Sequence, residues 1–255
     1  MESMGDHGGL FLTTVFATFF AAGIVKGVTG MGLPTVAIGV LGALMSPLSA
    51  AGLLIVPSCA TNLWQLLAGR HLRGLLARFR AMMLAALAGT VLGTALLAGG
   101  DVALSTAALG AMLLLYSAYT LVARPVRIPV RFEARLSPLV GAATGLLAGA
   151  TGVFTLPAVP YLQALGLERD ELVQALGLSF TTSTVALAAG LAWHGALPLQ
   201  NLALSTAAVL PSVAGMVLGQ AIRSRVSPTT FRRCFLLCLF LLGAEMLMRA
   251  LLQRF

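Results

Sequence analysis

One lysine, Lys26, is enclosed by long apolar stretches on both sides. An ammonium group inside a membrane is costly unless it is paired, hydrated or placed at the interface. Two interpretations of Lys26 follow from this cost. It offers a positive charge to an anion, or it lies close to the cytoplasmic surface, where basic residues set the orientation of membrane proteins.

Two later apolar stretches carry clusters of hydroxyl and amide side chains. The first cluster is Ser58, Thr61, Asn62 and Gln65, and the second is Ser179, Thr181, Thr182, Ser183 and Thr184. Such groups orient an oxyanion by hydrogen bonds without holding it by full charge, so that a carrier can release it. The competing interpretation is that each hydroxyl bonds its own helix backbone or a neighbouring helix. The matched clustering favours a polar pathway.

A glycine motif occurs twice in the chain. Gly23-x-x-x-Gly27-x-Thr29-Gly30 recurs 122 positions later as Gly145-x-x-x-Gly149-x-Thr151-Gly152, and Pro34 and Pro157 follow the two copies. Glycine and proline that interrupt an apolar stretch are typical of discontinuous helices meeting near the membrane midplane. The backbone N–H groups that begin the second arm of such a helix favour negative charge. We therefore expect two helix ends to face each other and form an anion site.

The candidate substrate-binding residues combine these features. They are Lys26, Gly27, Thr29, Gly30, Gly32, Asn62, Gln65, Gly149, Thr151, Gly152, Thr181 and Thr182. Two further residues are candidates for proton coupling. His194 follows a long apolar stretch beside Trp193, although such a pair also marks a membrane interface. Glu245 lies in the last apolar stretch, where it either couples protons or pairs with Arg249, four residues on.

Composition places most of this chain in lipid. Of its 255 residues, 58% are apolar and 9% are charged, a mixture that a water-soluble domain could not bury. Apolar stretches cover nearly the whole sequence, at 10–25, 33–45, 48–68, 81–98, 102–123, 137–151, 153–165, 172–193, 199–222 and 231–252. Several approach the ~20 residues that span a bilayer as helix, and they are too long for β-barrel strands. The expected fold class is an all-α polytopic membrane protein with eight to ten membrane segments.

The arginines form three clusters between the apolar stretches, so we expect no binding to nucleic acid. The clusters are Arg70, Arg73, Arg78, Arg80; Arg124, Arg127, Arg131, Arg135; and Arg223, Arg225, Arg232, Arg233. All three fall on the cytoplasmic side if residues 10–45 and 137–165 are each a hairpin of two short arms, with both termini outside. If each region is instead one broken span, the third cluster falls outside. We prefer the hairpins.

The repeat divides the chain into an N-terminal half, 1–123, a cytoplasmic linker, 124–136, and a C-terminal half, 137–255. Gly89-x-x-x-Gly93 and Gly215-x-x-x-Gly219 also match between the halves, although this spacing serves close helix packing as well. With five segments per half, an odd number, the second half must be inserted upside down relative to the first. Inverted repeats of this kind are typical of transporters.

At these residues the chain resembles the sulfite exporter TauE/SafE family of membrane permeases. The resemblance rests on the breaks at 27–32 and 149–152, the prolines after them, the polar patches and the basic loop between the halves. It implies transport of small anions such as sulfite, thiosulfate or sulfoacetate across the bacterial inner membrane. The second break departs from the family pattern. It reads Thr-Gly-Val-Phe-Thr-Leu-Pro, with Phe154 where glycines would form a tight backbone cradle.

The sequence favours a secondary transporter for small oxoanions, without enzyme activity, cofactor or metal. It contains no His-Glu-x-x-His pair, no Gly-x-Ser-x-Gly elbow and no nucleotide-binding motif. An anion channel and a non-transporting membrane scaffold are the alternatives. Paired helix breaks argue against a scaffold, but channels use them as carriers do. The expected partners are the small anion and membrane lipid, and a second copy of the chain, in a homodimer, is a further possibility.

Overall fold

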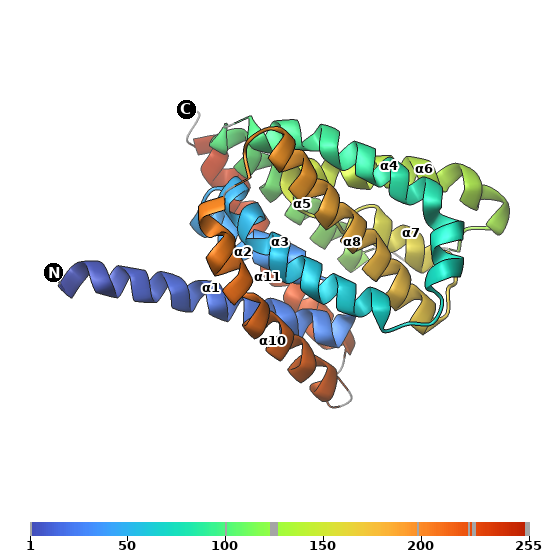
Figure 1. Ribbon diagram of the computed structural model, residues 1–255, viewed down its shortest axis with the longest axis horizontal. Coiled ribbons are helices and arrows are strands. Elements are labelled where there is room, and N and C mark those ends of the chain that lie inside the picture. Colours follow the sequence, from blue (N-terminus) through green and yellow to red (C-terminus); the bar gives the residue numbers. More distant parts are fainter. Residues whose placement is uncertain are drawn as a thin grey trace.

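The chain folds into a bundle of long helices (Figure 1). The computed structural model describes residues 2–99, 101–122, 127–197, 199–223, 225 and 228–252. In the N-terminal half the helices are α1 (Glu2–Thr29), α2 (Leu33–Leu44), α3 (Pro47–Leu67), α4 (Leu72–Ala98) and α5 (Val102–Val122). In the C-terminal half they are α6 (Val130–Thr151), α7 (Ala158–Ala164), α8 (Arg169–Trp193), α9 (Leu202–Ala207), α10 (Val209–Ile222) and α11 (Pro228–Leu252), with a 3₁₀ turn at Leu199–Asn201.

Seven stretches of the described chain are long and apolar enough to cross a membrane. They lie in α1, α3, α4, α5 and α8, in α9 together with α10, and in α11. The remaining segments are short or partly charged. α2 has 12 residues and α7 has 7, and α6 carries Arg131, Glu133 and Arg135 near its start. The described chain is therefore an all-α polytopic membrane protein, as predicted.

Both predicted helix breaks are present, at the ends of α1 and α6. Gly30, Gly32 and Gly152 have φ angles of 80°, 101° and 73°, a region that glycine enters without steric cost. At each break a threonine hydroxyl accepts a hydrogen bond from the backbone N–H two residues on, at 3.3 Å for Thr29 and 3.2 Å for Thr151. Each break is thus closed by the same local contact.

The arms of the two hairpins are unequal. α1 has 28 residues and α6 has 22, and only α2 and α7 are short. Figure 1 shows α2 folded back against α1. The prediction of two short arms is wrong for the first arm, because Gly27 and Gly149 lie inside continuous helix. There they permit close packing and do not end the helix.

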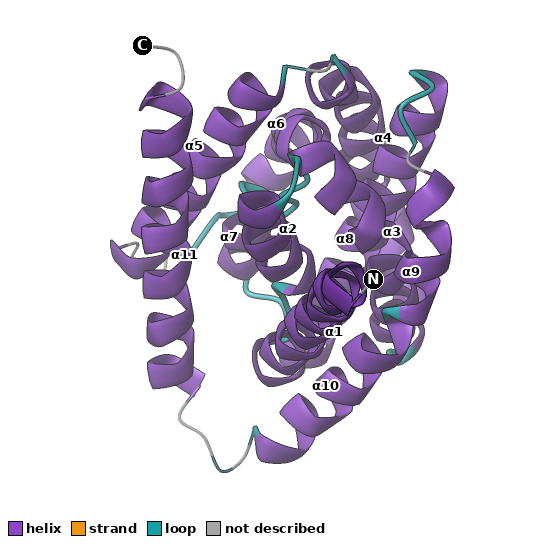
Figure 2. Ribbon diagram, turned by 90° about the vertical axis from the view of Figure 1, so that its left-hand side faces the viewer, coloured by secondary structure: helices purple, strands orange, loops and turns teal. Residues whose placement is uncertain are grey.

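Each half contributes its first helix to a pair with the other half. α1 packs on α10, and α6 packs on α4 (Figures 1 and 2). The contacts are close enough to require glycine: a Cβ on Gly27 would lie 2.2 Å from Met216 O, and a Cβ on Gly149 would lie 2.2 Å from Thr90 O. Met216 and Thr90 are 126 positions apart, close to the 122 positions that separate Gly27 from Gly149. The two pairs therefore use the same contacts.

Two further helix pairs join equivalent helices of the halves. Along α3 and α8, Asn62 contacts Thr184 and Leu66 contacts Gly177, so these helices run antiparallel. α5 and α11 also pack together, and a Cβ on either Gly110 or Gly243 would meet the carbonyl oxygen of the other, at 2.9 and 2.8 Å. Reciprocal antiparallel contacts are those that an inverted repeat would produce. The inversion itself stays a prediction.

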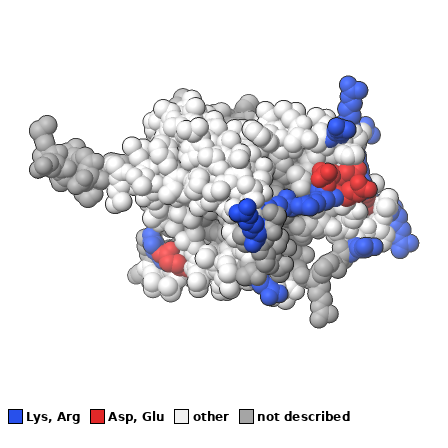
Figure 3. Space-filling view, turned by 90° about the horizontal axis from the view of Figure 1, so that it is seen from below, with Lys and Arg blue, Asp and Glu red and all other residues white. Residues whose placement is uncertain are grey.

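Basic side chains gather toward the end of the bundle away from the N-terminal part of α1 (Figure 3). Arg78 of α4 binds Glu133 of α6 there with two hydrogen bonds, of 2.6 and 2.8 Å. Arg124 and the side chain of Arg232 lie outside what the structure describes. The bundle thus has one arginine-rich end, which is the end that we predict to face the cytoplasm.

Replacing Gly149 by alanine should destabilise the fold, because the added methyl group would overlap the α4 backbone at Thr90. We expect a loss of about 1–3 kcal/mol, the usual cost of overpacking. The measurement is the thermal unfolding of the detergent-purified protein. Gly74→Ala in α4 is the matched control, because a Cβ there meets nothing within 4 Å. Equal melting temperatures for the two variants would contradict the packing described above.

Candidate anion site

Lys26 lies one turn before the end of α1 and is only 3% exposed. Its ammonium group donates hydrogen bonds to Thr61 Oγ1 at 3.2 Å and to Asn62 Oδ1, both on α3. Among the residues that the structure describes, no carboxylate forms a salt bridge with Lys26. Lys26 is therefore a buried lysine with neutral partners, and it is not a surface lysine.

The hydrogen bonds around Lys26 leave donor capacity unused. An ammonium group carries three protons, and the described residues accept two of them. The amide of Asn62 carries two N–H protons, of which one is given to Thr184 Oγ1 at 3.4 Å. The Thr61 and Thr184 hydroxyls donate to their own helix, to Pro57 O at 2.8 Å and to Phe180 O at 2.7 Å. One proton of Lys26 and one of Asn62 thus have no acceptor among the described residues.

Three helices position this cluster, which consists of Lys26, Thr61, Asn62 and Thr184. Lys26 comes from α1, Asn62 from α3 and Thr184 from α8. Asn62 and Thr184 occupy matching positions of the two halves, 122 residues apart, and they meet where α3 crosses α8. The cluster therefore lies at the contact between the halves.

A proline shapes α3 one turn before the cluster. Pro57 lies inside α3 and has no N–H, so the carbonyl of Leu53 lacks its helical donor. Ser205 of α9 takes that place, because its hydroxyl donates to Leu53 O at 2.8 Å and accepts from Val56 N at 3.4 Å. Ser205, which the sequence analysis did not single out, thus completes the backbone of the helix that carries Asn62.

Gln65 holds the first break in place. Its amide nitrogen donates to Gly30 O at 2.9 Å and to Val173 O at 2.8 Å, so both N–H protons are used. The remaining side-chain oxygen is buried, has no hydrogen-bond partner in the described part of the chain, and can only accept a hydrogen bond. Gln65 was predicted as a ligand. In the structure it links the α1–α2 break to α8, and it has no proton left for an anion.

The two breaks do not face each other. The Gly30 carbonyl is level with Gln65 on α3, whereas a Cβ on Gly152 would contact Leu54 of α3. These positions are eleven residues apart, or about 16 Å along a helix that rises 1.5 Å per residue. The expected pair of opposed helix ends is therefore wrong. The two breaks therefore lie at different levels along α3, and Thr61 and Asn62 of the Lys26 cluster lie between these levels.

The other predicted binding residues lie apart from the cluster. Gly27 and Gly149 are helix-packing positions, and the Thr151 hydroxyl donates to Leu147 O at 2.7 Å. The Thr181 hydroxyl donates to Gly177 O, and the Thr182 hydroxyl points to Met83 Sδ of α4 at 3.4 Å. The residue of α8 that reaches Asn62 is Thr184. The repeat offset of 122 pairs these two residues and was the signal that could have selected it.

Neither candidate for proton coupling touches the cluster. His194 is exposed at the end of α8. Glu245 forms a salt bridge with Arg249, and Arg249 also donates to Ala43 O at 3.3 Å. The structure thus supports the interpretation of Glu245 as the partner of Arg249.

Other hydroxyls within α3 and α8 are buried without a hydrogen-bond partner among the described residues. They belong to Ser58, Ser179 and Ser183, and the hydroxyls of Thr35, Thr144 and Thr155 elsewhere share this state. A buried hydroxyl that makes no hydrogen bond costs free energy.

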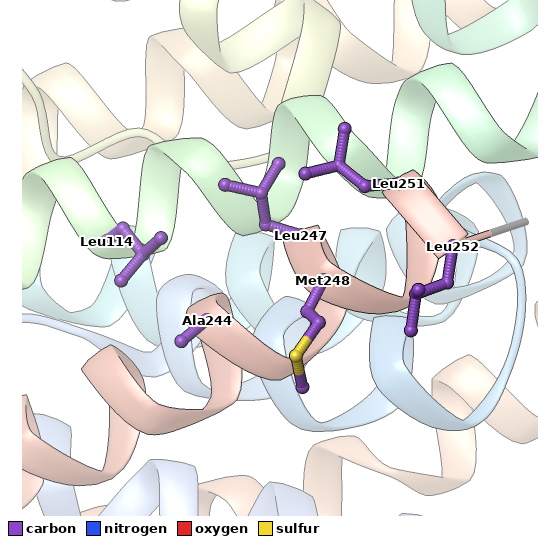
Figure 4. Close-up of a pocket in the computed structure, with 6 residues that line it drawn as sticks. All are labelled: Leu114, Ala244, Leu247, Met248, Leu251 and Leu252. Carbon is purple, nitrogen blue, oxygen red and sulfur yellow. The ribbon is translucent and has the colours of Figure 1, made fainter. Parts of the chain in front are cut away.

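A large groove on the bundle is unsuited to an anion. It has a volume of about 440 Å³ and lies between α5 and α11 (Figure 4). Its lining is Leu114, Ala244, Leu247, Met248, Leu251 and Leu252. These side chains contain only carbon and sulfur, so they offer no donor to a charged solute, and the groove is typical of a surface facing lipid.

A bundle of membrane-length helices that buries an unneutralised lysine among amide and hydroxyl groups has the features of a membrane permease. The family model for the sulfite exporter TauE/SafE family matches residues 15–246, from α1 into α11. The chain therefore belongs to the sulfite exporter TauE/SafE family, as predicted. A search of curated proteins and a search of solved structures gave no match.

Replacing Asn62 by leucine should destabilise the protein by about 2–3 kcal/mol, because Lys26 loses a hydrogen-bond acceptor in a buried site. Asn62→Asp should not, since a carboxylate at the same position would pair with the ammonium group. The measurement is thermal unfolding of both variants in the same detergent. If both variants lose the same stability, the ammonium group is not held as described.

Proposed function

We propose that this protein is a secondary carrier that moves small oxoanions, sulfite or related organosulfur anions, across the cell inner membrane. The observation that carries the proposal is the burial of Lys26 without a carboxylate partner among the described residues. A cation in a medium of low dielectric constant attracts an anion much more strongly than it would in water. The family to which the chain belongs supports the same class of substrate.

The unused protons of the cluster suit an oxoanion. Lys26 and Asn62 each have one proton left, from groups that lie within hydrogen-bonding distance of each other. Two oxygens of one sulfite ion could accept them together. A single ammonium group assisted by neutral groups holds the anion reversibly, as release on the other side requires.

The carrier mechanism that we propose is rocking of one half against the other around the α3–α8 crossing. It rests on inverted repeats, which the matched contacts of α1 with α10 and α6 with α4 support. The Lys26 cluster lies at that crossing, because Asn62 and Thr184 come from different halves. Tilting of the halves would open the cluster first to one side of the membrane and then to the other.

The test is a counterflow assay in proteoliposomes with labelled sulfite, thiosulfate, sulfoacetate and sulfate. Lys26→Met should abolish transport, because the anion loses the positive charge of the cluster. Thr184→Ala should reduce transport several-fold, about the effect of losing one hydrogen bond in the site. Thr182→Ala is the matched control. It removes the same group two residues away in α8, where the hydroxyl contacts Met83 of α4, and it should transport as the wild type does.

The same assay separates the competing functions. A carrier shows counterflow, whereas a channel does not. Absence of flux of every anion in the wild type would overturn the proposal. Equal losses of transport in Thr184→Ala and Thr182→Ala would show that the Lys26 cluster is not part of the transport path.

A further inference from the structure

A second polar cavity lies on the side of the first break that faces the arginine-rich end of the bundle. It has a volume of about 220 Å³. Its polar lining comes from five places in the chain: Thr29 at the end of α1, Tyr116 of α5, Gln163 of α7, Arg169 at the start of α8 and Arg223 after α10. The cavity is large enough for a small oxoanion, and both of its charged lining groups are positive.

The two arginines of this cavity lack carboxylate partners within the described part of the chain. Neither Arg169 nor Arg223 takes part in a salt bridge there. The nearby Glu171 pairs instead with His71, at 3.7 Å. Burial, together with repulsion by Arg169, lowers the pKa of the Arg223 guanidinium from its usual value. Arg169 is exposed and Arg223 is partly buried, and an anion between them would offset the repulsion of the two like charges.

The cavity adjoins the Lys26 cluster through the first break. Thr29 lines the cavity and lies three residues after Lys26, on the next turn of α1. The neighbouring Gly30 carbonyl is held by Gln65, which lies three residues after Asn62 on α3. One helical turn on each of two helices therefore separates the cavity from the cluster.

We propose that this cavity is a second oxoanion site, at which the substrate binds on the arginine-rich side before it reaches Lys26. Guanidinium groups bind oxoanions with paired, charge-assisted hydrogen bonds, and two of them on one cavity give a site of this chemistry. The proposal deepens the proposed function and rests on it. A lipid phosphate group would be recognised by the same chemistry, so the experiment must distinguish a free anion from a lipid.

The test compares Arg169→Gln, Arg223→Gln and the double variant with the wild type in the counterflow assay with labelled sulfite. The double variant should raise the half-saturating sulfite concentration by about tenfold on the arginine-rich side, as expected when a charge-assisted hydrogen bond is lost. Arg225→Gln is the matched control, because Arg225 is exposed and does not line the cavity. Its half-saturating concentration should equal that of the wild type.

Each measurement is made in vesicles of zwitterionic lipid alone and in vesicles that also contain anionic lipid. A difference between wild type and double variant in both lipids supports a free-anion site. A difference that requires anionic lipid would assign the cavity to a lipid phosphate group and overturn the proposal. A double variant that behaves as Arg225→Gln does would also overturn it, while leaving the carrier function intact. Only a wild type without transport would overturn both.

A second measurement does not depend on the folding of the variants. Phenylglyoxal modifies accessible arginines, and mass spectrometry measures the modification of Arg223 and Arg225 in the wild-type protein. The protecting anion is sulfoacetate, because sulfite adds to the aldehyde of phenylglyoxal and consumes it. Sulfoacetate should protect Arg223 and leave Arg225 unprotected. Equal modification of Arg223 with and without sulfoacetate would contradict the site.

Discussion

The burial of one ammonium group without a countercharge constrains the rest of this structure. Lys26 is 3% exposed, and among the described residues its hydrogen-bond acceptors are Thr61 and Asn62. Neutral groups can solvate a cation but cannot neutralise it. A carboxylate at position 62 would pair with the ammonium group, which the amide of Asn62 cannot do.

Close helix packing keeps this cation away from lipid. α1 carries Lys26 and is pressed against α10 through Gly23 and Gly27, whose backbone contacts leave no space for a side chain. The same arrangement joins α6 to α4 through Gly145 and Gly149. Lipid supplies little hydrophobic force between helices, so that small residues and short backbone distances must provide the attraction. The glycines that mark the sequence repeat are consequently the residues that hold the two halves together.

Much of the fold could be predicted from sequence, because apolar length and paired Gly-Pro interruptions depend on local chemistry. The predicted breaks at Gly30 and Gly152 are present. Which face of a helix meets which neighbour is not local, and here prediction was weaker. Thr182 and Thr184 differ by two residues, or about 200° around α8, so one contacts α4 and the other reaches Asn62. The cavity of Arg169 and Arg223 joins segments more than fifty residues apart, and no spacing in the sequence indicated it.

Pro57 makes the two halves depend on each other while the chain is being made. Until α9 has been synthesised, the carbonyl of Leu53 has neither its helical donor nor the hydroxyl of Ser205. An unpaired carbonyl is expensive in lipid. The first half can therefore insert its helices early, but α3 can reach its final conformation only after roughly 150 further residues have left the ribosome. The N-terminal half would then lie in the membrane with the Leu53 carbonyl unpaired until Ser205 of the second half reaches it.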